Sequence, residues 1–363
     1  MRSRLIWFKD NWAIAKRTIE ILGLALLVGW LLLVPAISTP AQSTSSTTWA
    51  VSIVLPARLV SGQPATLAVL GVDGRLAPNI TVKLGNDQRV KTDKTGRASF
   101  TAPMGGSVLI ATAAGNSAAA LVDPDVSTAQ AHAPIVAPVV SQFDEFPIYG
   151  TGFSGDADSN HVTLNDDRAF VLAASPECLT VLASPRAIPG PAKISIETPG
   201  GQWSAATTLV SLHFDPPLPA LVPEKRSKLA LHVQGSDQAL RILVENKTPG
   251  VLRFLRGDRQ EVLTSGGAQN SADVAVQAIT TGDFSFHARI LAAPDVDAAR
   301  RYLTAAASLA PKDLQRATRN IAERLTQHPH DTQKAGREID QIMSTTMSGD
   351  YRTLLESAAS ALE

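Results

Sequence analysis

Three residues of this chain have the side-chain types and the spacing of a calcium-binding loop. Asp156, Asp158 and Asn160 occupy alternate positions, as the first oxygen ligands of an EF-hand loop do. Such a loop also needs glycine at its sixth position and an acid at its twelfth, between two helices. His161 and Asp167 stand at those positions, and a strand pattern follows instead of a helix. We therefore expect a solvated polar loop, with these three residues as the calcium candidate and no metal cofactor.

Two other groups could do chemistry only with partners that the nearby sequence does not supply. His328 and His330 flank a proline beside Asp331, but a metal site needs three or four ligands. Cys178 is the only cysteine, so no disulfide can form within the chain. As a nucleophile it would need a histidine base and a group that orients that base. We expect a helix–helix turn at the two histidines and a partly buried, inert thiol at Cys178.

Residues 150–155 match the G-x-G-x-x-G pattern of dinucleotide-binding folds. In those folds the glycines follow a strand and open a helix, whose N-terminus holds the pyrophosphate. Here a polar loop and another strand pattern follow, so we interpret the glycines as a turn in a β-sandwich. The sequence also has no G-x-S-x-G elbow, no H-E-x-x-H motif and no phosphate loop.

These observations favour a protein that is not an enzyme, with no catalytic residue and no cofactor. One enzyme hypothesis stays open, namely a catalytic site without a recognised motif in the C-terminal part of the chain. Four residues there have suitable side chains, although nothing in their spacing requires catalysis. They are Asp258, Glu261, Asp283 and His287.

Length and charge limit the class of protein further. A chain of 363 residues is too long for one ordinary domain, so we expect two to four. Lys and Arg together number 33, as do Asp and Glu, so the net charge is zero and nucleic-acid binding is not expected. Gly and Pro number 24 and 23, many of them between alternating segments, which is typical of all-β modules.

Residues 1–41 have the pattern of an export signal. A mainly basic segment over residues 1–20 precedes an apolar run over 21–34, which ends at Pro35. This order directs the chain that follows out of the cytoplasm. Two interpretations stay open: a cleaved signal peptide, or a signal anchor that contacts the membrane through residues 19–37. Under both, the protein is extracytoplasmic, whether secreted, periplasmic or anchored in the cell envelope.

Residues 49–123 predict a first β-sandwich. Apolar or alternating segments, such as 65–70 and 107–112, are separated by glycine-containing turns. The segment from Val90 to Phe100 resembles the T-D-x-x-G-x-A-x-F hairpin of bacterial Ig-like repeats found in adhesins and surface proteins. That resemblance implies a hairpin in which Gly96 takes a positive φ at a tight turn.

Residues 134–212 contain a second series of short strands with an ordered set of motifs. The motifs run G-T-G-F at 150–153, N-x-V-x-L at 160–164, L-x-V-x-x-x-P at 179–185 and P-G-x-x-x-I-x-I-x-T-P-G-G at 189–201. This order resembles the IPT/TIG family of immunoglobulin-like domains, over about one fifth of the chain. The resemblance implies a sandwich that binds, spaces or braces, and it transfers no binding site.

The rest of the chain predicts a third β domain and a helical end. Residues 225–292 contain six strand candidates, for which a β-sandwich is the default fold. From residue 294 the apolar spacing becomes helical, and four short amphipathic helices are expected within 294–363. Asp295 and Asp331 are expected to cap helices, and Pro311 to open one. The predicted fold class is mainly β, with tandem immunoglobulin-like β-sandwiches and a C-terminal α-helical segment.

The function expected from these features is that of a non-catalytic, exported Ig-like scaffold that binds or spaces proteins. The alternative is a carbohydrate-binding or adhesion protein, in which sugar rings would stack on exposed aromatic side chains. Trp203, just after the Gly200–Gly201 turn, is the candidate ligand-binding residue for that alternative. The expected partner is therefore a protein, with a polysaccharide as the alternative.

Overall fold

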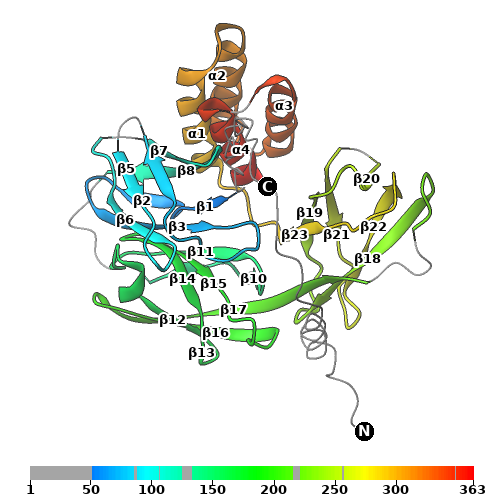
Figure 1. Cartoon of the computed structure of the whole chain (residues 1–363), viewed down its shortest axis with the longest axis horizontal. Helices are drawn as coiled ribbons and strands as arrows, with labels where there is room; N and C mark the ends of the chain where they lie inside the picture. Colours follow the sequence, from blue (N-terminus) through cyan, green and yellow to red (C-terminus); the bar gives the residue numbers. More distant parts are fainter. Residues whose placement is uncertain are drawn as a thin grey trace, which may run out of the picture. The chain divides into compact units, whose positions relative to one another are not determined.

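Alternating side chains become strands through much of residues 51–290. In β6 (Arg97–Thr101) Ala98 and Phe100 are buried, while Ser99 and Thr101 are exposed. Successive side chains of a strand point to opposite faces, so this pattern places one face on a core and the other in solvent. The computed structural model describes residues 51–85, 88–105, 107–124, 133–215, 221–255, 257–347 and 349–363, which all belong to one compact unit (Figure 1).

The first sandwich packs two sheets around one core. One sheet contains β1, β3 and β6, and the other has the order β2-β8-β7-β4-β5. Consecutive strands β1 and β2 lie in opposite sheets, because β1 pairs with β3 and β2 pairs with β8. Two face-to-face sheets of this kind make an immunoglobulin-like sandwich. Its other strands are β1 (Ser52–Val54), β2 (Arg58–Val60), β3 (Pro64–Leu70), β4 (Thr81–Leu84), β5 (Gln88–Lys91), β7 (Val108–Ala113) and β8 (Asn116–Asp123).

The second sandwich repeats this plan. Its sheets have the orders β14-β15-β11-β9 and β13-β12-β16-β17, and β10 pairs in parallel with β17. Phe146, Ile148, Leu179 and Ile194 are among the buried residues between them. The strands are β9 (Ile135–Val136), β10 (Val139–Ser141), β11 (Glu145–Tyr149), β12 (His161–Leu164), β13 (Asp167–Arg168), β14 (Phe170–Ser175), β15 (Cys178–Leu182), β16 (Gly190–Thr198) and β17 (Gly201–Phe214).

The third β domain also consists of two facing groups of strands. The order β18-β22-β20 continues from β17, and the order β21-β19-β23 makes a separate sheet. Leu231, Ile242, Val244, Val274 and Val276 are buried between the two. The strands are β18 (Arg226–Gln234), β19 (Arg241–Asn246), β20 (Leu252–Phe254), β21 (Arg259–Leu263), β22 (Ser271–Ala278) and β23 (Phe286–Ile290).

Hydrogen-bonded sheets run across the junctions between these sandwiches. Ala174 of β14 pairs with Thr66 of β3, which joins a sheet of the first sandwich to a sheet of the second. Strand β17 pairs with β16 as far as Leu209 and then with β18 from Ser211 to Phe214. One strand therefore serves both the second sandwich and the third β domain (Figure 1).

Four helices follow, at the positions where the apolar spacing changes. They are α1 (Val296–Leu309), α2 (Lys312–Gln327), α3 (Thr332–Thr345) and α4 (Asp350–Leu362). The Asp295 side chain caps α1 by accepting a hydrogen bond from the Ala298 N–H at 2.9 Å. Asp331 occupies the cap position of α3, but its side chain makes no cap hydrogen bond. Pro311 immediately precedes α2, one residue before the position expected for it.

The helices bury their apolar faces against one another and against the first sandwich. Leu121 of β8 belongs to the same buried cluster as the helix residues, and Val108, Ile110 and Ala119 pack against that cluster. The alternate residues of β8, Ala120 and Val122, belong to the core of the sandwich instead. Strands β7 and β8 are therefore covered on both faces.

The predicted fold class is confirmed, and one local expectation is corrected. Gly96 does take a positive φ, +73°, in a tight turn closed by the Gly96 N–H to Asp93 O bond. The strands on either side are not a hairpin, because β5 pairs with β4 and β6 pairs with β3 in the opposite sheet. The turn carries the chain from one sheet to the other, which a local motif cannot distinguish from a hairpin.

The expected export segment, residues 1–41, lies outside the described residues. Among the helices that are described, none is both long and apolar enough to cross a membrane.

Candidate functional site

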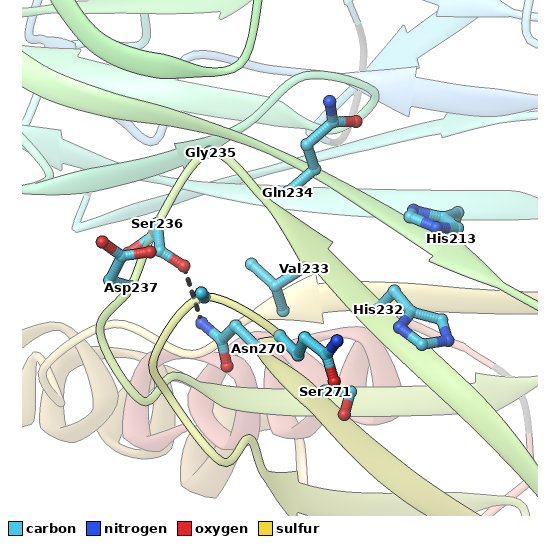
Figure 2. A pocket seen from close by; sticks show the side chains of 11 residues that line it. His213, His232, Val233, Gln234, Gly235, Ser236, Asp237, Asn270 and Ser271 are labelled. Atoms are coloured by element: carbon cyan, nitrogen blue, oxygen red, sulfur yellow. Dashed lines mark hydrogen bonds between the residues drawn. The ribbon is translucent and has the colours of Figure 1, made fainter.

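A polar hollow lies where strand β17 passes from β16 to β18. By strand register, His213 of β17 stands opposite His232 of β18, and His232 stands opposite Ser271 of β22. The turns at Gly235–Asp237 and Ala268–Asn270 complete a hollow of about 550 Å³. Figure 2 shows the two histidines at one side of the hollow and Ser236 and Asp237 at the other.

The two histidines form a stacked pair. Their ring centroids are 5.3 Å apart, and the ring planes are inclined by 23°. His232 Nε2 lies 2.8 Å from an Asp215 carboxylate oxygen, which holds the ring in place. The stacking covers one face of each ring and leaves the outer faces uncovered by the partner ring, and the contact with Asp215 orients His232 at the edge of the hollow.

The hollow contains the three residue types of a hydrolase triad without the geometry of one. Asp215 binds His232, and Ser271 is the cross-strand neighbour of His232. In hydrolases the aspartate is buried and the serine hydroxyl is hydrogen-bonded to the histidine. Here the Asp215 side chain is 58% exposed, and no hydrogen bond joins Ser271 to His232 within the described part of the chain. These three residues therefore lack the connections of a hydrolase triad.

The walls of the hollow are held by Asn270, which is buried. Its side-chain amide donates to the carbonyl oxygens of Ser236, at 2.9 Å, and Gln238, at 2.6 Å (Figure 2). Its Oδ1 accepts from the Gly266 N–H at 2.9 Å. One side chain therefore fixes two turns relative to each other, and the hollow is largely preformed. Sequence reasoning missed Asn270, because two of its partners are backbone carbonyl groups of a turn more than 30 residues earlier in the sequence.

The calcium candidates lie on the rim between the first and second sandwiches, and their oxygens already have partners. Asp158 is ion-paired with Arg97 at 2.7 Å. Asp156 accepts bonds from the Asp158 N–H and the Ser159 hydroxyl. Asn160 is buried and bonds to backbone atoms of Ser154 and Asp156. A guanidinium thus lies beside the Asp158 carboxylate, and Asp156 and Asn160 form hydrogen bonds within the loop.

Trp203 packs against the glycine-containing turn at residues 150–155. Its ring meets that of Phe153 edge to face, with centroids 6.1 Å apart. The ring also lies against Gly152 and Gly201, where an added Cβ would be 3.5 Å and 3.3 Å from it. The indole is half-buried at the edge of the second core, so much of the face that a sugar would need is covered.

The other candidate residues are separated from one another. The G-x-G-x-x-G segment precedes a 3₁₀ turn of three residues, Ala157–Ser159, and then strand β12. Cys178 is fully buried, and burial raises the pKa of its thiol to about 11. No group of three or more metal-binding side chains occurs among the residues that the structure describes, which include His328 and His330.

Two residues of the enzyme hypothesis, Glu261 and His287, take part in different ion pairs. Glu261 is ion-paired with Arg241 at 2.7 Å. His287 lies between Asp144 of the second sandwich, at 3.5 Å, and Glu245 of β19, at 3.8 Å. The Asp144 and Glu245 carboxylates raise the pKa of His287 to about 9. In turn, the bond from His287 and the charges of Lys247 and Arg259 hold the pKa of Glu245 well below its ordinary value.

Two groups of ion pairs connect parts of the chain that are far apart in sequence. Arg301 of α1 pairs with Asp123 of β8 and donates to the Val122 carbonyl at 2.9 Å. Arg58 of β2 pairs with Asp295 at 3.3 Å. These contacts fix α1 to the first sandwich. The sequence offers no local signal for them, because their members are more than 60 residues apart.

The second group holds the end of α4 to the third β domain. Arg289 of β23 and Arg259 of β21 both pair with Glu363. Through Glu245 and His287 the same group extends to Asp144 of the second sandwich. The helical segment is therefore bound both to the first sandwich and to the third β domain.

Comparison with known proteins identifies no family. No protein-family model matches the chain, and no curated protein matches its sequence. Solved structures with a related arrangement include the SGBP-B protein of the Bacteroides ovatus mixed-linkage glucan utilization locus, in complex with a mixed-linkage heptasaccharide. That protein is 11% identical over 70% of this chain and 63% of its own, with a TM-score of 0.18.

Two further similar structures consist of extracellular or tandem domains. The plexin A4 extracellular region, with domains 1 to 8, is 10% identical over 65% of this chain and 31% of its own, with a TM-score of 0.24. Domains A168–A170 of titin are 15% identical over 67% of this chain and 93% of their own, with a TM-score of 0.18. The chain thus spans less than two thirds of the first two structures. At these scores the likeness bears on no residue or activity of this protein.

Proposed function

We propose that this protein is an exported, non-catalytic scaffold of the cell envelope, in which Ig-like modules hold and space a protein partner. The second sandwich, residues 134–212, is the module that resembles the IPT/TIG family. The partner would contact loops and edge strands, which in sandwiches are the exposed, variable parts. The protein acts outside the cytoplasm, whether or not the N-terminal segment is cleaved.

The observation that carries this proposal is the bracing of the modules. Separate sandwiches on flexible linkers would have no need of a strand such as β17, which pairs in two of them. The helical segment adds a buried apolar contact to β7 and β8 and ion pairs to β21 and β23. A spacer must resist bending, and these contacts supply that resistance because they act at several points.

The chemistry of the described residues supports a binding role. The hydrolase-like residues at the hollow are incompletely connected and their aspartate is exposed, and the buried thiol is held neutral. Several ion pairs join different modules, as in Arg301–Asp123 and His287–Asp144. Charges in such positions fix geometry rather than act on a substrate.

In-cell crosslinking tests the proposal. Full-length tagged protein is crosslinked in its host, and the envelope fraction is examined by mass spectrometry beside a tagged, unrelated exported protein as control. We expect one dominant protein partner that the control does not capture, with crosslinks on loops or edge strands of the sandwiches. Equal capture by the control, or retention on cell-wall polysaccharide without a protein partner, would contradict the scaffold role.

A further inference from the structure

The hollow beside the histidine pair contains polar side chains that the fold does not use. Gln234, Asp237 and Gln269 are exposed, and their side chains have no hydrogen-bond partner within the described residues. Their backbones are well fixed, since Gln234 lies in β18 and Gly267 N–H bonds to the Asp237 carbonyl at 2.7 Å. A ligand could therefore engage these groups without ordering the backbone, although each side chain that it immobilises carries an entropy cost.

The walls and the base of the hollow, which a ligand would contact, are held in fixed positions. Asn270 joins the two turns of its wall by three hydrogen bonds. Gly235 packs against the second sandwich so closely that an added Cβ would lie 2.5 Å from the Leu209 carbonyl oxygen and 2.7 Å from the Gly190 nitrogen. The base of the hollow is the continuous ladder of β17, β18 and β22.

The lining selects the chemical class of the ligand. It includes no lysine and no arginine, and it carries the acidic side chain of Asp237, with Asp215 beside it. A phosphate or a polyanion would therefore be repelled. The side-chain amides of Gln234 and Gln269 can donate hydrogen bonds to hydroxyl groups and accept hydrogen bonds from them, and the Asp237 carboxylate can accept them. The stacked imidazoles offer a flat face to the C–H side of a sugar ring, in place of the usual Trp or Tyr.

We propose that this hollow binds a neutral saccharide chain, with Gln234, Asp237 and Gln269 on its hydroxyl groups and the His213–His232 pair against one ring. A volume of about 550 Å³ lies within the range of small-ligand sites. The site is separate from Trp203, which the fold uses for packing. The proposal goes beyond the scaffold role and does not depend on it.

Affinity electrophoresis tests the site with defined polymers. Full-length protein in mild detergent is run through native gels that contain a neutral β-glucan, a mannan or a xylan, and through a gel with an anionic polyuronate. We expect at least one neutral polymer to retard the protein and the polyuronate to leave it unaffected. The double variant Gln234→Ala/Gln269→Ala should weaken the retardation by about tenfold or more, because it removes two hydrogen-bonding groups.

A matched control distinguishes binding at this site from non-specific adsorption to the polymer. Gln202→Ala removes an exposed glutamine from the other end of β17 and should keep the full retardation. All three residues are exposed, so the variants should melt like the wild-type protein. The proposal is overturned if no neutral polymer in the panel retards the protein, if the polyuronate alone does so, or if the double variant is retarded as strongly as the wild type. Protein crosslinks at Gln234 or Gln269 that survive excess saccharide would also overturn it.

Discussion

Gly155 lies where the second sandwich touches the first. A Cβ at this position would be 2.0 Å from the Pro64 carbonyl oxygen, and the Thr66 hydroxyl donates to the Gly155 carbonyl at 2.7 Å. The backbones must therefore separate to accept any side chain. We expect Gly155→Ala to lower the free energy of unfolding by about 1–3 kcal/mol, the usual cost of overpacking.

Chemical denaturation measures this difference. Gly250→Ala is the matched control, because nothing lies within 4 Å of a Cβ at that position. An equal effect of the two substitutions would show that Gly155 acts through backbone flexibility and not through the contact with Pro64.

Cys178 provides a second test at the residue scale. Its side chain is fully buried, and the pKa of its thiol is raised to about 11, so little thiolate forms near neutral pH. We expect a thiol reagent to label the folded protein only as fast as the region opens, and to label urea-unfolded protein at once. Rapid stoichiometric labelling of folded protein would contradict the burial of Cys178.

The structural roles of these residues could be predicted from the sequence only in part. The sequence indicated a sandwich turn at Gly150–Gly155, which the structure has. It indicated a partly buried thiol at Cys178, which is in fact fully buried. The tight approach of Gly155 to Pro64 could not be predicted, since about 90 residues separate them and no local pattern encodes a contact of that kind. The roles of Asn270 and of the unpaired side chains of the hollow could not be predicted for the same reason.

At the scale of elements, β8 is the strand on which two cores meet. Leu121 faces the helices, and Ala120 and Val122 face the sandwich. We expect Leu121→Ala to destabilise the protein by about 2–5 kcal/mol, because it leaves a cavity between β8 and the helices. Leu263→Ala is the control on β21, where the leucine is 68% exposed, and should change stability by no more than about 0.5 kcal/mol. If both substitutions lowered stability by similarly small amounts, the result would show that the helices do not pack on β8.

The sequence contained a sign of this packing. The segments Val108–Ala111 and Ala118–Val122 are apolar at every position, whereas a sheet with one solvent face alternates. A continuous run in an antiparallel sheet therefore indicates a cover on both faces. The identity of the cover, a helical bundle almost 200 residues later, follows only from the three-dimensional fold.

Strand prediction succeeded in the third β domain and was incomplete in the first sandwich. The six strand candidates of 225–292 each overlap an observed strand, and Asp295 caps α1 as expected. Strands β2, β5 and β8 were not expected individually. Strand β2 pairs with β8, which is distant in the sequence, whereas β5 pairs with the preceding strand β4 and was joined instead to β6 by the resemblance of Val90–Phe100 to a hairpin.

At the scale of the whole molecule, His287 links the second sandwich to the third β domain. Its pKa is raised to about 9 by Asp144 and Glu245, above the ordinary value of about 6.5 in an unfolded chain. The folded state therefore binds the proton more tightly, and the stabilisation is complete below about pH 6.5 and is lost as the pH rises through about 9. Because the ring is 42% exposed, solvent screening makes the effect modest.

Melting temperatures between pH 6 and pH 9.5 test this linkage. We expect the wild-type protein to lose stability across this range by more than His287→Gln does, since the variant has no proton to lose. His161→Gln, an exposed histidine on β12, should follow the wild type. Parallel curves for the wild type and His287→Gln would refute the linkage.

The contacts between the modules predict that the sandwiches and the helical segment unfold as one cooperative body. Scanning calorimetry of the wild type, Arg301→Ala and Arg300→Ala measures this cooperativity. Arg301 binds Asp123 and the Val122 carbonyl across the junction, whereas the neighbouring Arg300 pairs only within α1.

We predict a single cooperative transition for the wild type. Arg301→Ala should shift that whole transition down, by an amount that corresponds to about 1–3 kcal/mol for lost bonds to a charged group, and Arg300→Ala should leave it nearly unchanged. Two or more independent transitions in the wild type, with Arg301→Ala moving only one of them, would contradict the account.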